Sequence, residues 1–432
     1  MSSFLIAGLE IKGLWNRINL DLKFYQDVNV IIGPNASGKT TILNFLRYVL
    51  TADLTRLYEI EFEAATIRLR GFTNNSRRTI KIRRDDQGLT VATPHNFKIP
   101  AESLLTARRG VRRSVQWGRS PSNEAEDPIQ ELMALVPAVW LPVSRRLPIP
   151  ERADEDDVHE FWKTSMEIRN FRLESVDQRL TELINDLQRY RLSLETQLSE
   201  RYKDFERRVL ELMLFNPDHD KWPFRIPTGE LDEEQKELLV RAFAAAGLLN
   251  EGMRKRIDEH FSVAYDVASK IQQTKGELDP QDIFVLPLVP RTREMIAAAR
   301  QLEEARESLF SPLRKFEKIA SSFLNNKTVH VVDNGQLQVA FESPPAQTIA
   351  PERLSSGEKQ ILILLTQALL RENVPVVYVV DEPELSLHVS WQEKLLQSLR
   401  ELGGQIQIIV ATHSPDIVGP YRDKVIDLGA RR

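Results

Sequence analysis

The most informative segment of the chain is residues 27–50, which read DVNVIIGPNASGKTTILNFLRYVL. The apolar run Asp27–Ile32 predicts a buried strand, and the apolar spacing over Lys39–Leu50 predicts a helix. Between them lies the pattern G-x-x-x-x-G-K-[ST], complete and in the strand–loop–helix context that it requires. Glycine at 33 and 38 lets the backbone curl, so that successive N–H groups point inward and can hold phosphate oxygens.

We expect this loop to bind ATP together with Mg²⁺. Lys39 is placed to bridge the β- and γ-phosphates as a catalytic residue, and the Thr40 hydroxyl is placed to ligate Mg²⁺. The N-terminus of the helix adds its partial positive charge. The predicted nucleotide contacts are Gly33, Pro34, Asn35, Ala36, Ser37, Gly38, Lys39, Thr40 and Thr41.

Two further strands are expected to end beside this loop. The run Val376–Val380 ends in Asp381, expected to hold Mg²⁺ through water, and Glu382, expected to orient and deprotonate the water that attacks ATP. The run Ile406–Val410 leads to His413, which is expected to contact the γ-phosphate. Each feature alone has a structural explanation, because strands often end in acidic turns. Together with the phosphate loop, they predict a catalytic site.

A fourth motif, Ser355-Ser356-Gly357-Glu358, precedes the apolar helix Ile361–Leu370. A serine hydroxyl and glycine N–H groups at a helix start form an anion site, so all four residues are candidates for nucleotide binding. Ser355 and Glu358 also fit an ordinary capping box, which needs no ligand.

The four motifs in this order resemble those of the ABC-type ATPases. The resemblance implies that the motif at Ser355 faces the phosphate loop of a second copy, giving a homo-oligomer, a dimer or higher, with head-to-tail ATP sites. The chain departs from the family pattern at Ser356, where glycine is common, and at Glu358, where glutamine is usual.

The glutamine loop of that family has no clear equivalent. Gln116 and Gln130 are candidates, and residues 144–146 (Ser-Arg-Arg) are a third place for an element that couples nucleotide state to the rest of the chain.

About 315 residues separate Lys39 from Leu354. Within this interval, residues 158–215 contain no Gly or Pro, and their apolar residues alternate at steps of 3 and 4, the spacing of a coiled coil, with a stutter through Leu198 to Tyr202. A single long helix lying on a globular body is the alternative. Further helices are expected at 231–248, 251–277 and 291–324.

The predicted fold class is therefore α/β, an ABC-type P-loop ATPase head with an inserted α-helical coiled-coil arm. The predicted segments are 1–150 and 327–432 for the two lobes of the head and 151–326 for the insertion. Two local features are also expected: a strand over Glu59–Arg70, and a type I′ turn at Asn334-Gly335 between two hairpin strands.

The long insertion and the run EPELSLH at residues 382–388 resemble the SMC, RecF and OLD-like branch. The absence of cysteine excludes a zinc hook, and the insertion is too short for a chromosome clamp. Because the sequence ends 19 residues after His413, the nuclease domain of OLD nucleases is not expected. The remainder resembles the stand-alone OLD-like ATPases of bacterial anti-phage systems, with the PARIS ATPase subunit as first choice and that of Septu as second. This implies a separately encoded effector, for which a nuclease is expected, and a phage trigger protein.

A basic stretch raises DNA as a further candidate partner. Residues 68–119 contain 13 Arg and Lys against three acidic residues, and Arg108, Arg109, Arg112 and Arg113 lie near Trp117. Such a patch fits a phosphate backbone. It also fits a solvated hairpin face, an acidic protein such as a DNA-mimicking phage product, or the acidic run 154–157 of another subunit.

Three function classes follow. The first is a regulatory ATPase scaffold that controls an effector. The second is a RecF-like DNA-binding ATPase in repair, and the third is a toxin-like enzyme acting alone. The formal net charge of −4 argues against a uniformly basic coat. No signal peptide and no apolar run of about 20 residues is present, so we expect a cytoplasmic protein without a membrane partner.

Overall fold

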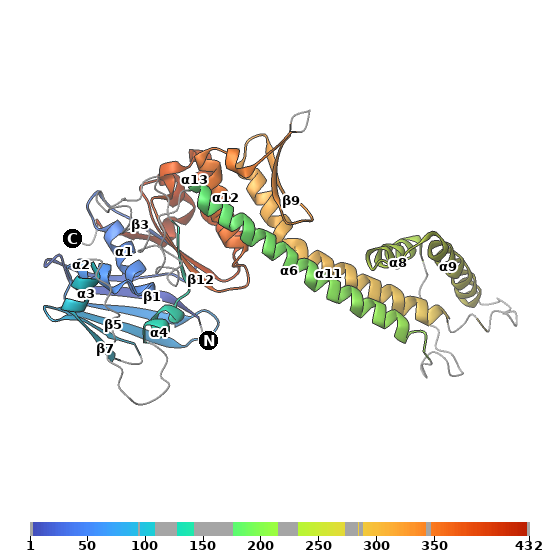
Figure 1. The fold of residues 1–432 in the computed structure, drawn as a ribbon, viewed down its shortest axis with the longest axis horizontal. Helices are drawn as coiled ribbons and strands as arrows, with labels where there is room; N and C mark the ends of the chain where they lie inside the picture. The colour runs from blue at the N-terminus through green and yellow to red at the C-terminus, as the bar shows by residue number, and fades with distance from the viewer. Residues whose placement is uncertain are drawn as a thin grey trace. The chain divides into compact units, whose positions relative to one another are not determined.

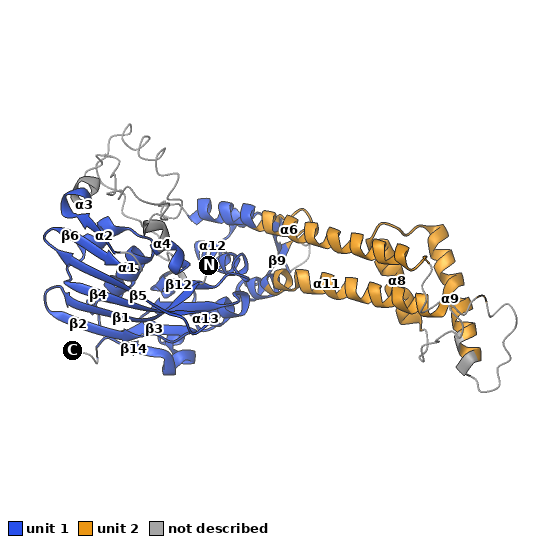
Figure 2. Cartoon of the chain, turned by 90° about the horizontal axis from the view of Figure 1, so that it is seen from below, with its two compact units in different colours: residues 1–186, 316–330, 337–432 blue, residues 187–315, 331–336 orange. Residues whose placement is uncertain are grey.

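The computed structural model describes residues 3–93, 96–108, 128–141, 176–214, 232–272, 284, 288–342 and 347–429. The chain divides into two compact units, which Figure 2 colours separately. Unit 1 comprises Met1–Asp186, Phe316–His330 and Leu337–Arg432, and unit 2 comprises Leu187–Lys315 and Val331–Gln336. The predicted segment boundaries at residues 150 and 326 stay a prediction.

Unit 1 contains an antiparallel sheet with the strand order β2-β1-β4-β5-β6-β7 (Figure 1). Along β4 and β5, buried and more exposed residues alternate, because successive side chains of a strand point to opposite faces. One face therefore packs on the core and the other faces outward. The strands are β1 Phe4–Leu14, β2 Ile18–Lys23, β4 Ala64–Gly71, β5 Arg77–Asp85, β6 Gly88–Ala92 and β7 Asn96–Pro100.

A second sheet of unit 1 is parallel, with the order β14-β3-β13-β12-β8. Its central strands are almost continuously apolar, which is typical of parallel sheets covered on both faces. The strands are β3 Val28–Ile32, β8 Ala138–Leu141, β12 Val376–Asp381, β13 Ile406–Ala411 and β14 Val425–Asp427. The predicted strands around the phosphate loop, the acidic pair and His413 are all present.

One hydrophobic core joins the two sheets to helix α1 (Lys39–Leu50). Phe45 of α1 belongs to the same buried cluster as Leu9 of the antiparallel sheet and Val379 of the parallel sheet. A buried polar contact also links the sheets: the Gln407 side chain accepts from the backbone N–H of Ile6 (2.9 Å) and donates to its carbonyl (2.8 Å). Because both bonds are buried, they fix one sheet against the other.

The remaining elements of unit 1 are short helices and a small sheet of order β11-β10-β9. They are α2 Leu54–Glu59, α3 Ala101–Arg108, α4 Pro128–Leu135, β9 Lys327–Val331, β10 Leu337–Phe341, β11 Thr348–Ile349, η2 Pro351–Arg353, α12 Ser356–Leu369, η3 Pro383–Ser386, α13 Val389–Leu402, α14 Pro415–Val418 and η4 Gly419–Lys424.

Unit 2 is helical. Its helices are α8 Glu233–Ala245, α9 Glu251–Gln272 and parts of α6 Val176–Glu211 and α11 Leu288–Phe323. The two long helices lie side by side in both views (Figures 1 and 2) and contact each other through Arg191, 4.3 Å from the ring centre of Phe310, and through the Arg208–Glu294 ion pair at 3.0 Å. The apolar residues of the described part of the predicted seam are buried or half-buried on α6. The predicted fold class, an α/β head with an inserted α-helical segment, is confirmed.

One local prediction is correct only in part, and another is wrong. The strand predicted over Glu59–Arg70 is present as β4 but starts later. The residues before β4 do not form a strand, because Asp53 caps a short helix, α2, by accepting from the N–H of Arg56, and β4 begins only at Ala64. The hairpin turn is not type I′, because that turn needs a positive φ at both central residues and Asn334 does not have one. Gly335 alone does, at φ +79°, after a turn closed by its N–H to the carbonyl of Val332. This is the three-residue loop in which a type I turn precedes a left-handed glycine.

Candidate functional site

The phosphate loop lies between β3 and α1. Gly38, its last glycine, has φ +96°, and a Cβ at this position would lie 2.9 Å from Cη2 of Trp15, so only glycine fits without movement. Ala36 also has a left-handed backbone, at φ +62°. This conformation costs a non-glycine residue about 1–2 kcal/mol. Such strain is often found at ligand sites, where the surroundings hold it.

Lys39 is only 6% exposed although it carries a charge. Its Nζ donates to the carbonyl oxygens of Gly33 (2.9 Å) and Pro34 (3.2 Å). Both carbonyls belong to the loop itself, so the ammonium group is already held at the loop. Phosphate oxygens are stronger partners for a cation than neutral carbonyls. The arrangement therefore suits the predicted phosphate contact.

The two predicted Mg²⁺ ligands, Thr40 and Asp381, lie close enough for the Thr40 hydroxyl to lower the pKa of the Asp381 carboxyl. Burial raises the pKa of the Asp381 carboxyl above its usual value, and the neighbouring charges of Glu382 and Glu384 act in the same direction. The hydrogen bond from Thr40 and the charge of Lys39 oppose this rise without cancelling it. The Oδ1 atom of Asp381 is buried and has no hydrogen-bond partner.

This donor set fits Mg²⁺. An unpartnered carboxylate oxygen beside a hydroxyl supplies hard oxygen ligands, and Mg²⁺ is usually bound by one or two such groups together with substrate phosphates and water. Among the described residues, no group of three or more His, Cys, Asp and Glu side chains is arranged to hold a metal ion.

The parallel register brings the predicted catalytic residues to one edge of the sheet. Asp381 lies beside Ala411, and Ala411 lies beside Ile31, which is two residues before the phosphate loop. Glu382 follows β12 with φ +50° and ψ +54°, and its N–H donates to the carbonyl of Ala411 at 2.8 Å. Glu382 is thus held in a strained, left-handed conformation at the strand end, next to the predicted Mg²⁺ ligand.

Glu384 organises this edge, and its role was not predicted from the sequence. Its carboxylate accepts from the Thr412 hydroxyl (2.8 Å) and from the backbone N–H of His413 (2.6 Å). The network continues into α13, because the Ser414 hydroxyl donates to the Gln392 side chain at 2.6 Å. The sequence signal was its place in the run EPELSLH, two residues after Glu382. Glu384 therefore fixes the backbone that carries His413.

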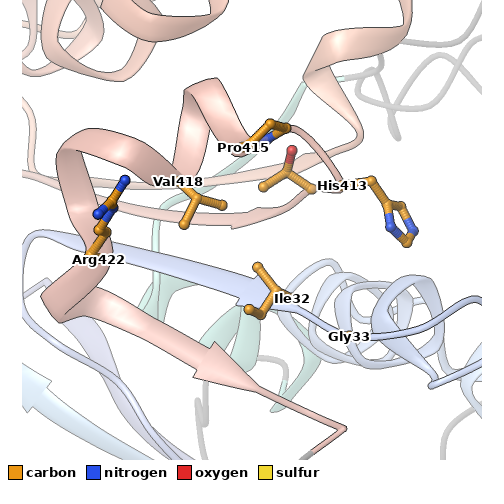
Figure 3. A pocket seen from close by; sticks show the side chains of 7 residues that line it. Ile32, Gly33, His413, Pro415, Val418 and Arg422 are labelled. Atoms are coloured by element: carbon orange, nitrogen blue, oxygen red, sulfur yellow. The ribbon is translucent and has the colours of Figure 1, made fainter.

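A cavity of about 290 Å³ opens beside the loop (Figure 3). His413 and Arg422 lie at its two ends in the figure, with Ile32 and Val418 between them. Its lining comprises Ile32, Gly33, Thr412, His413, Pro415, Val418 and Arg422. The cavity is at the lower end of the size range of ligand sites, so it suits a small group rather than a whole nucleotide.

The fourth motif caps helix α12. The capping box is present: Glu358 accepts from the Ser355 N–H (2.9 Å), and the Ser355 hydroxyl accepts from the Glu358 N–H (3.4 Å). Glu358 also pairs with Lys327 at 2.6 Å, and Lys359 pairs with Asp177 of α6 at 2.5 Å. Burial alone would raise the pKa of Glu358, but hydrogen bonds from Lys327 and Ser355 hold it below its usual value. The Glu358 carboxylate is thus occupied within the chain, and it positions the helix start.

Of the basic stretch and the candidate coupling elements, the structure describes only a part. Several of the predicted residues lie outside the described part of the chain, namely Arg109, Arg112, Arg113, Trp117, Gln116, residues 144–146 and residues 154–157. Arg108 is the last residue of α3, and Gln130 lies in α4.

A family model described as "AAA domain, putative AbiEii toxin, Type IV TA system" matches residues 28–419. This match spans the phosphate loop, the acidic pair, His413 and the whole insertion. The chain belongs to this family. The family assignment agrees with the P-loop ATPase head of ABC type that the site residues form.

Two curated relatives match parts of the chain. The Retron Ec83 probable ATPase of Escherichia coli is 28% identical over 167 residues, 33% of this chain and 30% of that protein. The uncharacterized ABC transporter ATP-binding protein YejF of Escherichia coli (strain K12) is 40% identical over 77 residues, 17% of this chain and 14% of that protein. The chain therefore covers less than a third of either relative.

Solved structures with similar folds include the Smc head domain of Pyrococcus furiosus with an extended coiled coil, bound to the C-terminal domain of ScpA. It has 14% identity and a TM-score of 0.39, with 96% of this chain and 91% of that chain covered. The recombination mediator protein RecF-ATPrS of the RecFOR pathway has 12% identity and a TM-score of 0.35, with 99% and 98% covered. Within the described residues, no helix combines the length and apolar character needed to cross a membrane.

Proposed function

We propose that the chain is a regulatory ATPase that binds and hydrolyses Mg²⁺·ATP, assembles with further copies through its nucleotide sites, and controls a separately encoded effector in anti-phage defence. The observation that carries the nucleotide part is the Thr40–Asp381 pair with its unpartnered Oδ1. The defence part is supported by the wording of the family description and by the partial match to a retron ATPase.

In the proposed reaction, Lys39 and the first turn of α1 bind the phosphates. Thr40 and Asp381 would hold Mg²⁺, which would neutralise charge on the phosphate oxygens. Glu382 accepts a proton from the attacking water. His413 contacts the γ-phosphate, and Glu384 keeps its backbone in place. The left-handed conformation of Glu382 supports this assignment, because such strain is often found at functional sites.

The second copy contributes the N-terminus of α12 to this site. A helix N-terminus attracts anions, and here the capping box holds Ser355 and the first turn of the helix in a fixed conformation. The nucleotide then lies between Lys39 of one copy and Ser355 of the other. The PARIS ATPase subunit is the first choice for the type of system and that of Septu is the second. The family match does not favour the RecF-like alternative.

Mixing two inactive variants tests the shared site. Lys39→Ala loses the phosphate loop function but keeps Ser355, and Ser355→Arg does the reverse. Each alone should hydrolyse no ATP. In a 1:1 mixture of dimers, half of the molecules pair the two variants and hold one intact site of two, so about a quarter of the wild-type activity should return. No recovery in a mixture that demonstrably exchanges subunits would refute the head-to-tail arrangement.

Glu382→Gln tests the hydrolysis itself. Loss of a general base should slow ATP hydrolysis by about 100-fold or more, while ATP binding and ATP-dependent assembly persist. Glu393→Gln, an exposed position on α13, is the matched control. A wild-type rate in Glu382→Gln would remove Glu382 as the base.

Co-purification of the chain with its neighbouring gene product tests the effector. A chain that causes toxicity without any partner would instead favour an enzyme acting alone.

A further inference from the structure

The outer face of the antiparallel sheet carries a concentration of positive charge. On β4 to β7, the side chains that point away from the core include five exposed cations, which we call the basic face: Arg70, Arg77, Lys81, Arg83 and Lys98. The register places them on neighbouring strands, on one face of the sheet. Because the whole protein has a net charge of −4, this charge is local and not a property of the entire surface.

The basic face is poorly neutralised by the chain. Arg77, Lys81 and Arg83 have no acidic partner among the described residues, whereas Arg68 on the same side pairs with Asp21 and Glu10 of the neighbouring strands. Asp85 ends β5 on this side, so the basic face keeps one acidic neighbour, whose carboxylate accepts from the Gln87 N–H at the turn.

The cross-strand register places two of these cations against each other. Arg70 lies directly opposite Arg77 on adjacent strands. Like charges in this position destabilise a sheet. A surface that keeps such a pair on a protein rich in acidic residues is suited to a negatively charged partner.

The side chains between the cations indicate which partner. They are small or polar, namely Thr66, Thr79, Thr90, Ala92 and Asn96. A protein interface usually has large apolar or aromatic anchors at its centre, and single-stranded nucleic acid needs aromatic side chains for base stacking. The one aromatic residue of these four strands, Phe97, packs against the core instead.

Arg, Lys, Thr and Asn are the side chains that contact phosphate oxygens of a duplex. We propose that the basic face binds the phosphate backbone of duplex DNA without sequence preference. This binding is separate from the nucleotide site, and it does not depend on the proposed function.

The salt dependence of DNA binding by the full chain tests the proposal. The assay is fluorescence anisotropy with a duplex of about 30 base pairs, between about 50 and 200 mM salt. The variant replaces three cations of β5 with threonine, which favours strands: Arg77→Thr, Lys81→Thr and Arg83→Thr. The control removes the same charge from exposed positions of α6: Arg201→Ala, Lys203→Ala and Arg207→Ala.

Loss of three phosphate contacts should reduce the salt slope by about 2.7, so that over this range the wild type loses about 40-fold more affinity than the β5 variant. The α6 control should keep the wild-type slope. Equal slopes in all three proteins would overturn the proposal. Equally tight binding of single-stranded DNA or poly-glutamate would overturn the assignment to duplex DNA.

A second measurement needs no variant. Lysine acetylation of the wild-type protein, read by mass spectrometry, should be slowed at Lys81 and Lys98 when duplex DNA is bound. Lys203 and Lys255, both exposed elsewhere, should react at an unchanged rate. Unchanged acetylation of Lys81 and Lys98 at saturating DNA would contradict the proposal even if the β5 variant fails to fold.

Discussion

Replacing Glu384 with alanine should loosen the segment that carries His413. The substitution removes two hydrogen bonds to one carboxylate, from the Thr412 hydroxyl at 2.8 Å and from the His413 N–H at 2.6 Å. A hydrogen bond to a charged group contributes about 1.5–3 kcal/mol. Because Glu384 is half-buried, water screens part of the interaction energy. We therefore take the lower value of about 1.5 kcal/mol for the hydrogen bond from the His413 N–H to the Glu384 carboxylate. Local opening should then become about tenfold more frequent.

Hydrogen exchange measures this opening directly. The exchange of a peptide covering residues 411–414 should be about tenfold faster in Glu384→Ala than in the wild type. Glu393→Ala removes the same charge from an exposed position of α13 and should change nothing. ATP binding should also stay close to wild type, because the contacts of Lys39 are untouched, while hydrolysis should fall. Identical exchange in the two variants would show that Glu384 does not hold this segment, and the account of the site edge would be wrong.

Three further outcomes are expected. Lys39→Ala should weaken binding of a fluorescent ATP analogue by about 100-fold or more, while the exposed Lys12→Ala leaves it unchanged; equal affinities would contradict the phosphate contact. Asp381→Asn removes a carboxyl group whose pKa burial raises, so the variant should have a higher unfolding temperature without nucleotide. It should also need a higher Mg²⁺ concentration for ATP binding. A lower unfolding temperature would contradict the expected gain in stability. Because the folded state lowers the pKa of Glu358, its stabilising effect is fully present above the ordinary value of 4.5 and is lost as the pH falls through the folded value. Acid unfolding of Glu358→Gln should lack this part of the pH dependence.

The parts of the fold that depend on local sequence could be predicted. The phosphate loop needs glycine at a left-handed position and a strand before it, and the strands ending at Asp381 and Ala411 are continuous apolar runs. The burial of the α6 seam follows from its spacing in the same way.

Contacts between distant residues could not be predicted. Glu384 and His413 are 29 residues apart, Lys327 and Glu358 are 31 apart, and Asp177 and Lys359 are 182 apart. Periodicity carries no information about such pairs, because only the packing of the elements brings them together. The prediction of a type I′ turn was wrong for a related reason. The dipeptide Asn-Gly allows several turn types, and the three-residue loop between the strands selects a type I turn followed by a left-handed glycine.

The charges at the sheet edge explain why Mg²⁺ and ATP should bind together. Asp381, Glu382 and Glu384 lie within four residues, and burial and mutual repulsion already raise the pKa of Asp381. ATP without a metal would bring further negative charge to this edge, where Lys39 is the cation of the loop. A divalent cation held at Asp381 would offset two of these three negative charges and so would favour the approach of the phosphates. The same edge also contains the strained residues Ala36 and Glu382. This edge therefore combines repulsion between neighbouring carboxylates with two non-glycine residues in the left-handed conformation.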